Sequence, residues 1–152
     1  MISLNHAVAH FSAEATGGTV SLDDLAGQVV VLYFYPKDNT PGCTTESQDF
    51  AGQFKAFQQA GATVLGVSRD SIKSHDGFKT KLGLPFELIA DPDETLCQLF
   101  GVMKMKNMYG KQVRGIERST FLIDAKGQLV REWRGVKVAG HVEEVLKAVQ
   151  SL

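Results

Sequence analysis

The sequence predicts an α/β domain with a central mixed β-sheet that helices flank. Apolar runs rich in β-branched and aromatic residues alternate with segments of helical spacing, which is typical of parallel strands joined by helices. Near the end of the chain, two strand-like runs follow each other across a short turn, which predicts an antiparallel hairpin. Because both kinds of strand pairing are expected, the sheet should be mixed, with helices covering its apolar faces.

The first half of the chain supplies a strand, a helix and a second strand. Residues 29–35, VVVLYFY, contain no polar alternation and predict a strand buried on both faces. Phe50, Phe54 and Phe57 then recur at helical spacing up to Gly61, a residue typical of helix ends. ATVLGVS, residues 62–68, reads as the next buried strand, so this part of the chain forms a βαβ unit.

The second half continues the alternation, and its pattern fits a thioredoxin-like layout in one domain, residues 1–152. It contains a polar helix (71–82), a short strand (86–91), a short helix with an acidic cap (93–102), a solvated loop with methionines near the site entrance (103–111), the hairpin (119–135) and an amphipathic helix (141–152).

The composition argues for a globular protein that handles small molecules or proteins. Of the 152 residues, 43% are hydrophobic and 22% charged, and the net charge is -1, which argues against nucleic acid or an anionic membrane as partner. No apolar run is long enough to cross a membrane. The start of the sequence lacks the pattern of a secretion signal, so we expect a cytoplasmic protein.

One cysteine is placed where a helix should begin. Thr40 suits a helix cap and Pro41 suits the first helical position, which puts Cys43 in the first turn. There, free backbone N–H groups and the helix dipole favour thiolate over thiol, and we expect the Thr40 hydroxyl to point toward the Cys43 amide. A small buried residue is the simpler interpretation of most cysteines. The proline-set helix start favours a reactive one, at the sheet edge where ligands bind in α/β folds.

The same residues carry a family resemblance. PKDNTPGC, residues 36–43, matches the PxxxTxxC signature of the peroxiredoxins. YFYPKDNTPGCTTES and MYGKQVRGIERSTFLID resemble the bacterioferritin comigratory protein, or Q-type, subfamily. The resemblance extends over nearly the whole chain and implies a thioredoxin-like fold and a thiol-dependent peroxidase without cofactors.

The resemblance also implies roles for particular residues. Cys43 would be the peroxidatic nucleophile, which forms a sulfenic acid. Thr40 would offer its hydroxyl to the peroxide, and Pro36 would shield the thiolate from water. Arg118 matches the active-site arginine of the family, and its permanent charge suits both the thiolate and the bound peroxide; the alternative is a surface arginine at a strand start. Glu46, one turn beyond Cys43, could pair with a nearby cation, but a charged residue on a helix is more often solvated, so Glu46 stays outside the catalytic set.

The chain departs from the subfamily at the second cysteine. Many members carry a resolving cysteine five residues after the first, where this chain has Gln48. Cys97, in LCQLF, is expected to pack in the core. The sequence therefore predicts a one-cysteine cycle in which an external thiol reduces the sulfenic acid. The N-terminal AVAHF also lacks the family's usual proline, which leaves the geometry of the first strand open.

Partners and alternatives follow from these residues. The expected substrates are hydrogen peroxide and alkyl hydroperoxides, and the expected reductant is thioredoxin, glutaredoxin or a small thiol, with the protein a monomer or weak homodimer. The absence of a CxxC motif argues against a disulfide exchanger, and the four scattered histidines give little support for a metal. The rival function is a thioredoxin-fold binding protein or chaperone without peroxidase turnover.

Overall fold

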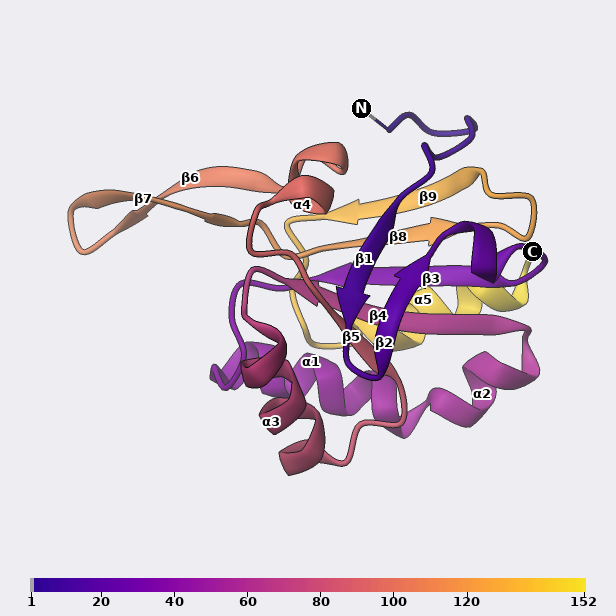
Figure 1. Cartoon of the computed structure of the whole chain (residues 1–152), viewed down its shortest axis with the longest axis horizontal. Helices are drawn as coiled ribbons and strands as arrows, with labels where there is room; N and C mark the ends of the chain where they lie inside the picture. The colour runs from indigo at the N-terminus through magenta and orange to yellow at the C-terminus, as the bar shows by residue number, and fades with distance from the viewer. Residues whose placement is uncertain (1) are drawn as a thin grey trace.

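A computed structural model, which describes residues 2–152, contains a seven-stranded sheet in the order β2-β1-β5-β4-β3-β8-β9 (Figure 1). Strands β3, β4 and β5 are parallel, whereas β1, β2, β8 and β9 pair antiparallel. The predicted mixed sheet is therefore confirmed. Its strands are β1 Ser12–Ala15, β2 Gly18–Ser21, β3 Val29–Phe34, β4 Ala62–Ser68, β5 Glu87–Ala90, β8 Ser119–Ile123 and β9 Leu129–Arg134.

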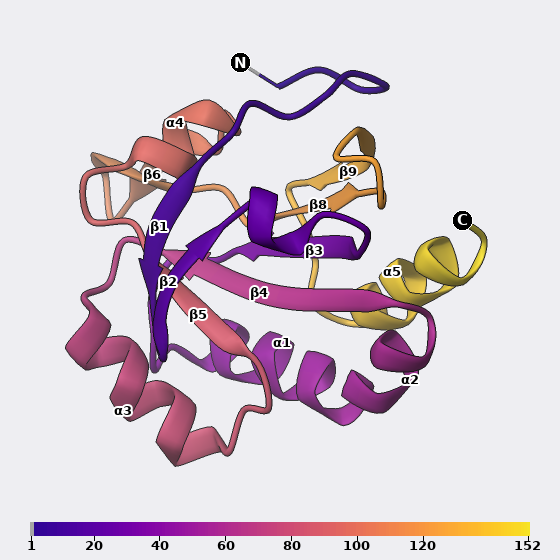
Figure 2. The same cartoon turned by 45° about the vertical axis from the view of Figure 1, so that its right-hand side comes forward.

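Two cores lie on opposite faces of this sheet. Alternate residues of β3 enter different cores, with Leu32 and Phe34 in one and Val31 and Tyr33 in the other. Helices α1, α2, α3 and α5 cover one face, and α4 and the N-terminal segment cover the other (Figures 1 and 2). The helices are η1 Asp23–Leu25, α1 Pro41–Gly52, α2 Phe54–Gln59, α3 Ile72–Leu82, α4 Thr95–Leu99 and α5 His141–Gln150. Over residues 2–152, no helix has the length and apolar character needed to cross a membrane.

Several boundaries differ from the expected ones. The helix predicted up to Gly61 is divided at Gln53, which separates α1 from α2. The acidic cap of α4 also differs, because Glu94 has a left-handed backbone (φ 62°) and makes no side-chain cap bond. Instead, the Asp91 carboxylate accepts hydrogen bonds from the backbone N–H groups of Leu96 (3.1 Å) and Cys97 (2.8 Å). In AVAHF, Ala7 forms an isolated bridge with Gln128, and the first strand begins only at Ser12.

The prediction of a loop over 103–111 is wrong. Strands β6 Met103–Met108 and β7 Lys111–Ile116 form a separate two-stranded arm that projects from the body (Figure 1). Tyr109 (φ 53°) and Gly110 (φ 79°) form its two-residue turn, and paired positive φ angles suit the twist of a tight hairpin. The arm was missed because it packs against the body only at its base, so its strands lack the apolar run of a buried strand.

Candidate active site

The loop that follows β3 brings Cys43 to the first turn of α1, as the sequence predicts. Thr40 is the residue before the helix, and its carbonyl accepts the first helical hydrogen bond, from the Thr44 amide at 2.9 Å. Pro41 occupies the first helical position. Cys43 is buried and belongs to the core under α1, while Pro36 and Thr40 are half-buried above it.

The Thr40 side chain does not point where the sequence led us to expect. Its hydroxyl donates to the Lys37 carbonyl at 2.8 Å and makes no cap bond to the helix. The reason is that the loop folds back on itself, which offers the hydroxyl a nearby carbonyl acceptor. As a consequence, the Thr40 oxygen can still accept a hydrogen bond from another group. The Thr40 hydroxyl makes no hydrogen bond to the Cys43 amide.

Arg118 lies beside the cysteine. Its Nη2 is 3.4 Å from the Cys43 Sγ, and the two residues are 75 positions apart in the sequence. The register explains the approach, because β8 pairs antiparallel with β3 so that Ser119 is opposite Phe34. Arg118, one residue earlier, therefore reaches the loop at the end of β3, and its guanidinium places a positive charge at the sulfur.

Glu46 was expected to be solvated, and the structure shows the opposite. Its side chain is inaccessible to solvent, and its Oε1 accepts a hydrogen bond from Arg118 Nη1 at 2.7 Å. Burial raises the pKa of Glu46 to about 7, and the charge of Arg118 opposes that rise. Glu46 thus orients the guanidinium from behind. Its position three residues after Cys43, on the same helix face, was the signal in the sequence.

Gly42 was also missed as a site residue. A Cβ atom added there would lie 3.1 Å from Arg118 Nη2, which is tighter than an ordinary contact. The absence of a side chain at this position therefore admits the guanidinium to the helix start. Glycine between the cap and a reactive residue is a cue in the sequence, but only the fold shows which group needs the space.

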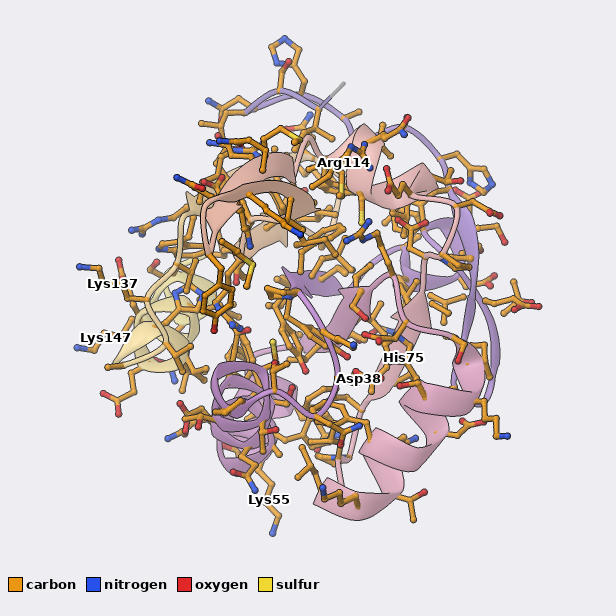
Figure 3. All side chains as sticks on the ribbon, turned by 90° about the vertical axis from the view of Figure 1, so that its left-hand side faces the viewer. Asp38, Lys55, His75, Arg114, Lys137 and Lys147 are labelled. Carbon is orange, nitrogen blue, oxygen red and sulfur yellow. The ribbon has the colours of Figure 1, made fainter. Side chains whose placement is uncertain are left out.

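A buried polar cluster holds the other end of the loop (Figure 3). The ring of His75, in α3, contacts the Asp38 carboxylate through Nδ1 (2.8 Å) and the Ile89 carbonyl through Nε2 (2.9 Å). Asp38 also accepts from the hydroxyls of Tyr35 (2.7 Å) and Ser74 (2.8 Å). Burial alone would raise the pKa of Asp38, but the hydrogen bonds from His75 and Tyr35 lower it. Asp38 is therefore ionised.

His75 is held at both ring nitrogens. Nδ1 contacts the Asp38 carboxylate and Nε2 contacts the Ile89 backbone carbonyl. Both side chains of the His75–Asp38 pair are buried. Asp70 lies close enough to make a three-residue cluster of metal-ligand type, but the ring nitrogens are already engaged within the protein. We interpret the cluster as a clasp between the loop and α3.

Cys97 lies on the other face of the sheet. Its side chain is in the core under α4, whereas Cys43 is in the core under α1. Burial, and after it the hydrogen bond and charge of Asp91, raise the pKa of the Cys97 thiol well above its ordinary value. Both cysteines are free, and the sheet stands between them.

Comparisons with known proteins agree with this geometry. Residues 4–132 match the model of the AhpC/TSA family. The chain is 58% identical over 137 residues to peroxiredoxin Bcp of Xanthomonas campestris pv. campestris (90% of this chain, 86% of that protein) and 50% identical over 136 residues to peroxiredoxin Bcp of Bacillus subtilis (90% and 87%). Among solved structures, the Xanthomonas campestris bacterioferritin comigratory protein, studied for its alkyl peroxide reduction activity, superimposes with a TM-score of 0.91 at 53% identity (99% and 97%).

Proposed function

The chain belongs to the AhpC/TSA family and, like its relatives named peroxiredoxin Bcp, is a thiol-dependent peroxidase; we propose that Cys43 is its peroxidatic nucleophile. The resemblance drawn from PKDNTPGC and the predicted thioredoxin-like fold are confirmed. The observation that carries the residue assignment is the 3.4 Å contact between the Cys43 sulfur and Arg118 Nη2 at the start of α1. A fixed cation at a helix N-terminus is the setting that a reactive thiolate needs.

In the first step, the Cys43 thiolate attacks the terminal oxygen of a hydroperoxide. A sulfur–oxygen bond forms, the oxygen–oxygen bond breaks, and the departing oxygen takes a proton to leave as water or an alcohol. Arg118 stabilises the thiolate before the attack and the negative charge on the departing oxygen during it. We expect hydrogen peroxide and alkyl hydroperoxides to be the substrates.

The other site residues orient the reactants. Thr40 accepts a hydrogen bond from the O–H of the hydroperoxide, since its own hydrogen is directed to the Lys37 carbonyl. Glu46 holds Arg118 in place, and Pro36 excludes water from the half-buried mouth of the site. Substrate is thus aligned before the sulfur attacks.

We further propose that the sulfenic acid is resolved by an external thiol. Cys97 lies in the core on the opposite face of the sheet from Cys43, and its thiol is beside the Asp91 carboxylate. A disulfide needs the two α-carbons within about 7 Å of each other. Crossing a packed sheet to meet that requirement would mean unfolding both cores, so we assign Cys97 a packing role. Thioredoxin, glutaredoxin and a small thiol are the candidate reductants.

Intact-mass analysis of the purified protein after one equivalent of hydrogen peroxide tests both proposals. We expect the mass of one added oxygen atom, located at Cys43 by trapping with dimedone, and its loss on adding dithiothreitol. The rival function, a binding protein without turnover, predicts no thiol-dependent loss of peroxide. An intramolecular disulfide in place of the added oxygen would refute external resolution.

A further inference from the structure

The arm formed by β6 and β7 has one face that differs from the other. Directly opposed residues of an antiparallel pair share a face, and here Lys106 pairs with Val113 and Met108 with Lys111. Alternation adds Lys104 to the same side. We call this side, made of Lys104, Lys106, Met108, Lys111 and Val113, the lysine face.

The lysine face is turned toward the Cys43 site. The Lys106 Nζ donates to the Ile116 carbonyl at 2.5 Å, two residues from Arg118. Burial and then Arg118 lower the pKa of Lys106, whereas Glu117 and, to a lesser degree, Cys43 raise it, so the ammonium lies within electrostatic range of Arg118 and Cys43. The opposite face is held toward α4, because Arg114 forms an ion pair with Glu94 at the start of that helix. Figure 3 views the molecule from the side of the arm.

The arm exposes both large apolar side chains and basic side chains. Over residues 2–152, six large hydrophobic side chains are exposed, and four of them belong to the arm: Met105, Met108, Tyr109 and Val113. Residues 103–116 hold four basic side chains and no acidic one, although the chain as a whole has a net charge of -1. Lys104 pairs with Glu117 and Arg114 with Glu94, so Lys106 and Lys111 are the two basic side chains of the arm for which no ion pair is found over residues 2–152. Exposed apolar side chains among charges of one sign mark a surface for a partner of the opposite sign.

We propose that the lysine face is the docking surface for the reductant, a thiol–disulfide oxidoreductase with acidic side chains around its reactive cysteine. The proposal rests on external resolution of the sulfenic acid, as argued above. A protein reductant must bring its own cysteine to the buried Cys43, and Lys106 of the lysine face lies within electrostatic range of that sulfur. Met108 and Val113 supply the apolar centre of the contact, and Lys106 and Lys111 supply long-range attraction.

The docked partner supplies both thiols that reduce the Cys43 sulfenic acid. Its thiolate attacks the Cys43 sulfur, a disulfide forms, the sulfur–oxygen bond breaks, and hydroxide leaves as water after taking a proton. The partner's second thiol then attacks the partner sulfur of that mixed disulfide. This releases the Cys43 thiolate and leaves the partner oxidised.

Two matched double variants test the proposal. Met108→Ser with Lys111→Gln changes the lysine face, and Met105→Ser with Gln112→Glu makes the same net change in charge and apolarity on the opposite face. The probe is an acidic thioredoxin kept reduced by its reductase and NADPH. We expect the lysine-face variant to lower kcat/KM for thioredoxin about tenfold, mainly through KM, and less at high salt. The opposite-face variant should match the unmodified chain.

A second assay separates failure of docking from failure of the proposed function. With dithiothreitol as reductant, all three proteins should turn over equally, because a small thiol needs no docking surface. Equal thioredoxin kinetics in both variants would overturn the docking proposal while leaving dithiothreitol turnover intact. Absence of dithiothreitol turnover in the unmodified chain would instead refute the peroxidase cycle. Sedimentation that shows a dimer lost only in the lysine-face variant would assign the face to a second copy of this chain and overturn the proposal.

Discussion

The two cysteines occupy opposite faces of one sheet, and their neighbours carry opposite charge. Cys43 and Cys97 are exposed by only 1% and 0%, so burial does not distinguish them. Cys43 lies beside the Arg118 guanidinium, whereas Cys97 lies beside the Asp91 carboxylate. A cation favours the thiolate and an anion opposes it. The sign of the nearest fixed charge therefore favours Cys43 over Cys97 as the proposed nucleophile.

The local backbone reinforces this difference. In α1 the Thr40 side chain accepts no hydrogen bond from the first-turn amides near Cys43, because its hydroxyl donates to the Lys37 carbonyl. In α4 the Asp91 carboxylate accepts from the amide of Cys97 itself. The sulfur that we propose as the nucleophile thus lies at a helix start without a side-chain cap, whereas Cys97 lies at a helix start that Asp91 caps.

Removing each sulfur in turn gives the largest contrast. We expect Cys43→Ser to abolish peroxide consumption, since a serine hydroxyl does not ionise near neutral pH. Cys97→Ala should retain most of the activity with dithiothreitol or thioredoxin as reductant. A peptide map of peroxide-treated protein under non-reducing conditions provides the check. A stoichiometric disulfide between the two cysteines would show that the sheet does not separate them in the cycle.

Removing the Arg118 cation should make Cys43 less reactive toward peroxide, as we expect Cys97 to be. Arg118→Ala is expected to slow sulfenic acid formation by about 10²–10³, the usual cost of losing a charged donor at a developing anion. Arg118→Lys should restore only part of the rate, because an ammonium cannot bond Glu46 and the sulfur with one planar fork. Stopped-flow measurement with hydrogen peroxide gives both rates. Unchanged rates in the alanine variant would remove Arg118 from the site.

The Arg118 cation also contributes to the lowered pKa of His141, which lies on the same side of the sheet. Burial, and to a lesser degree Arg118, lower the pKa of His141 to about 4 from 6.5, and its Nε2 contacts the Thr120 hydroxyl at 2.7 Å. Because the pKa of His141 is lower in the folded state than in the unfolded state, protonation of His141 favours unfolding. The folded state therefore has its full stability above pH 6.5 and loses this contribution as pH falls through 4. The loss should be about 2–3 kcal/mol, partly reduced by solvent screening.

Urea unfolding at pH 7, 5.5 and 4 measures this effect. His141→Gln should lose less stability on acidification than the unmodified chain, since glutamine keeps a polar partner for Thr120 but does not titrate. The matched control is His10→Gln, at an exposed histidine paired with Asp23 on the surface. If His141→Gln and His10→Gln show the same dependence on pH, the buried histidine does not contribute.

The smallest expected effect concerns the space between the helix start and the guanidinium. A methyl group in Gly42→Ala would meet Arg118 Nη2 at 3.1 Å, so the guanidinium must shift by a few tenths of an ångström. We expect the rate of sulfenic acid formation to fall about tenfold, with stability little changed. Gly52→Ala, at the far end of the same helix where a Cβ meets no other atom, is the control. Equal rates in the two variants would mean that the arginine tolerates displacement.

The parts of the molecule with a strong apolar pattern could be predicted from the sequence. Strand β4 was placed at its observed bounds, because ATVLGVS is apolar and flanked by a helix end and a polar loop. The hairpin of β8 and β9 is predicted by two strand-like runs on either side of a turn that contains Lys126 and Gly127. The sequence does not predict the arm, because β6 alternates lysine with methionine and most side chains of β6 and β7 are not buried, so the apolar run of a core strand is missing.

The candidate site was predictable only where a local motif carried it. The start of α1 and the position of Cys43 follow from Thr40 and Pro41. The burial of Glu46 could not be derived in that way, because it depends on Arg118 arriving from a strand 72 residues away. The direction of the Thr40 hydroxyl depends on how the loop folds back, which spacing along a helix does not encode.

The clasp of Asp38 and His75 provides this enzyme with a natural spectroscopic reporter. Both ring nitrogens of His75 take part in hydrogen bonds, and the side chain is inaccessible to water. A ring N–H proton held in this way exchanges slowly and should give a downfield line in a proton NMR spectrum without any isotope label. Because Asp38 belongs to the loop that leads to Cys43, the line should move when the sulfur is oxidised. The redox state of the protein can then be followed in real time.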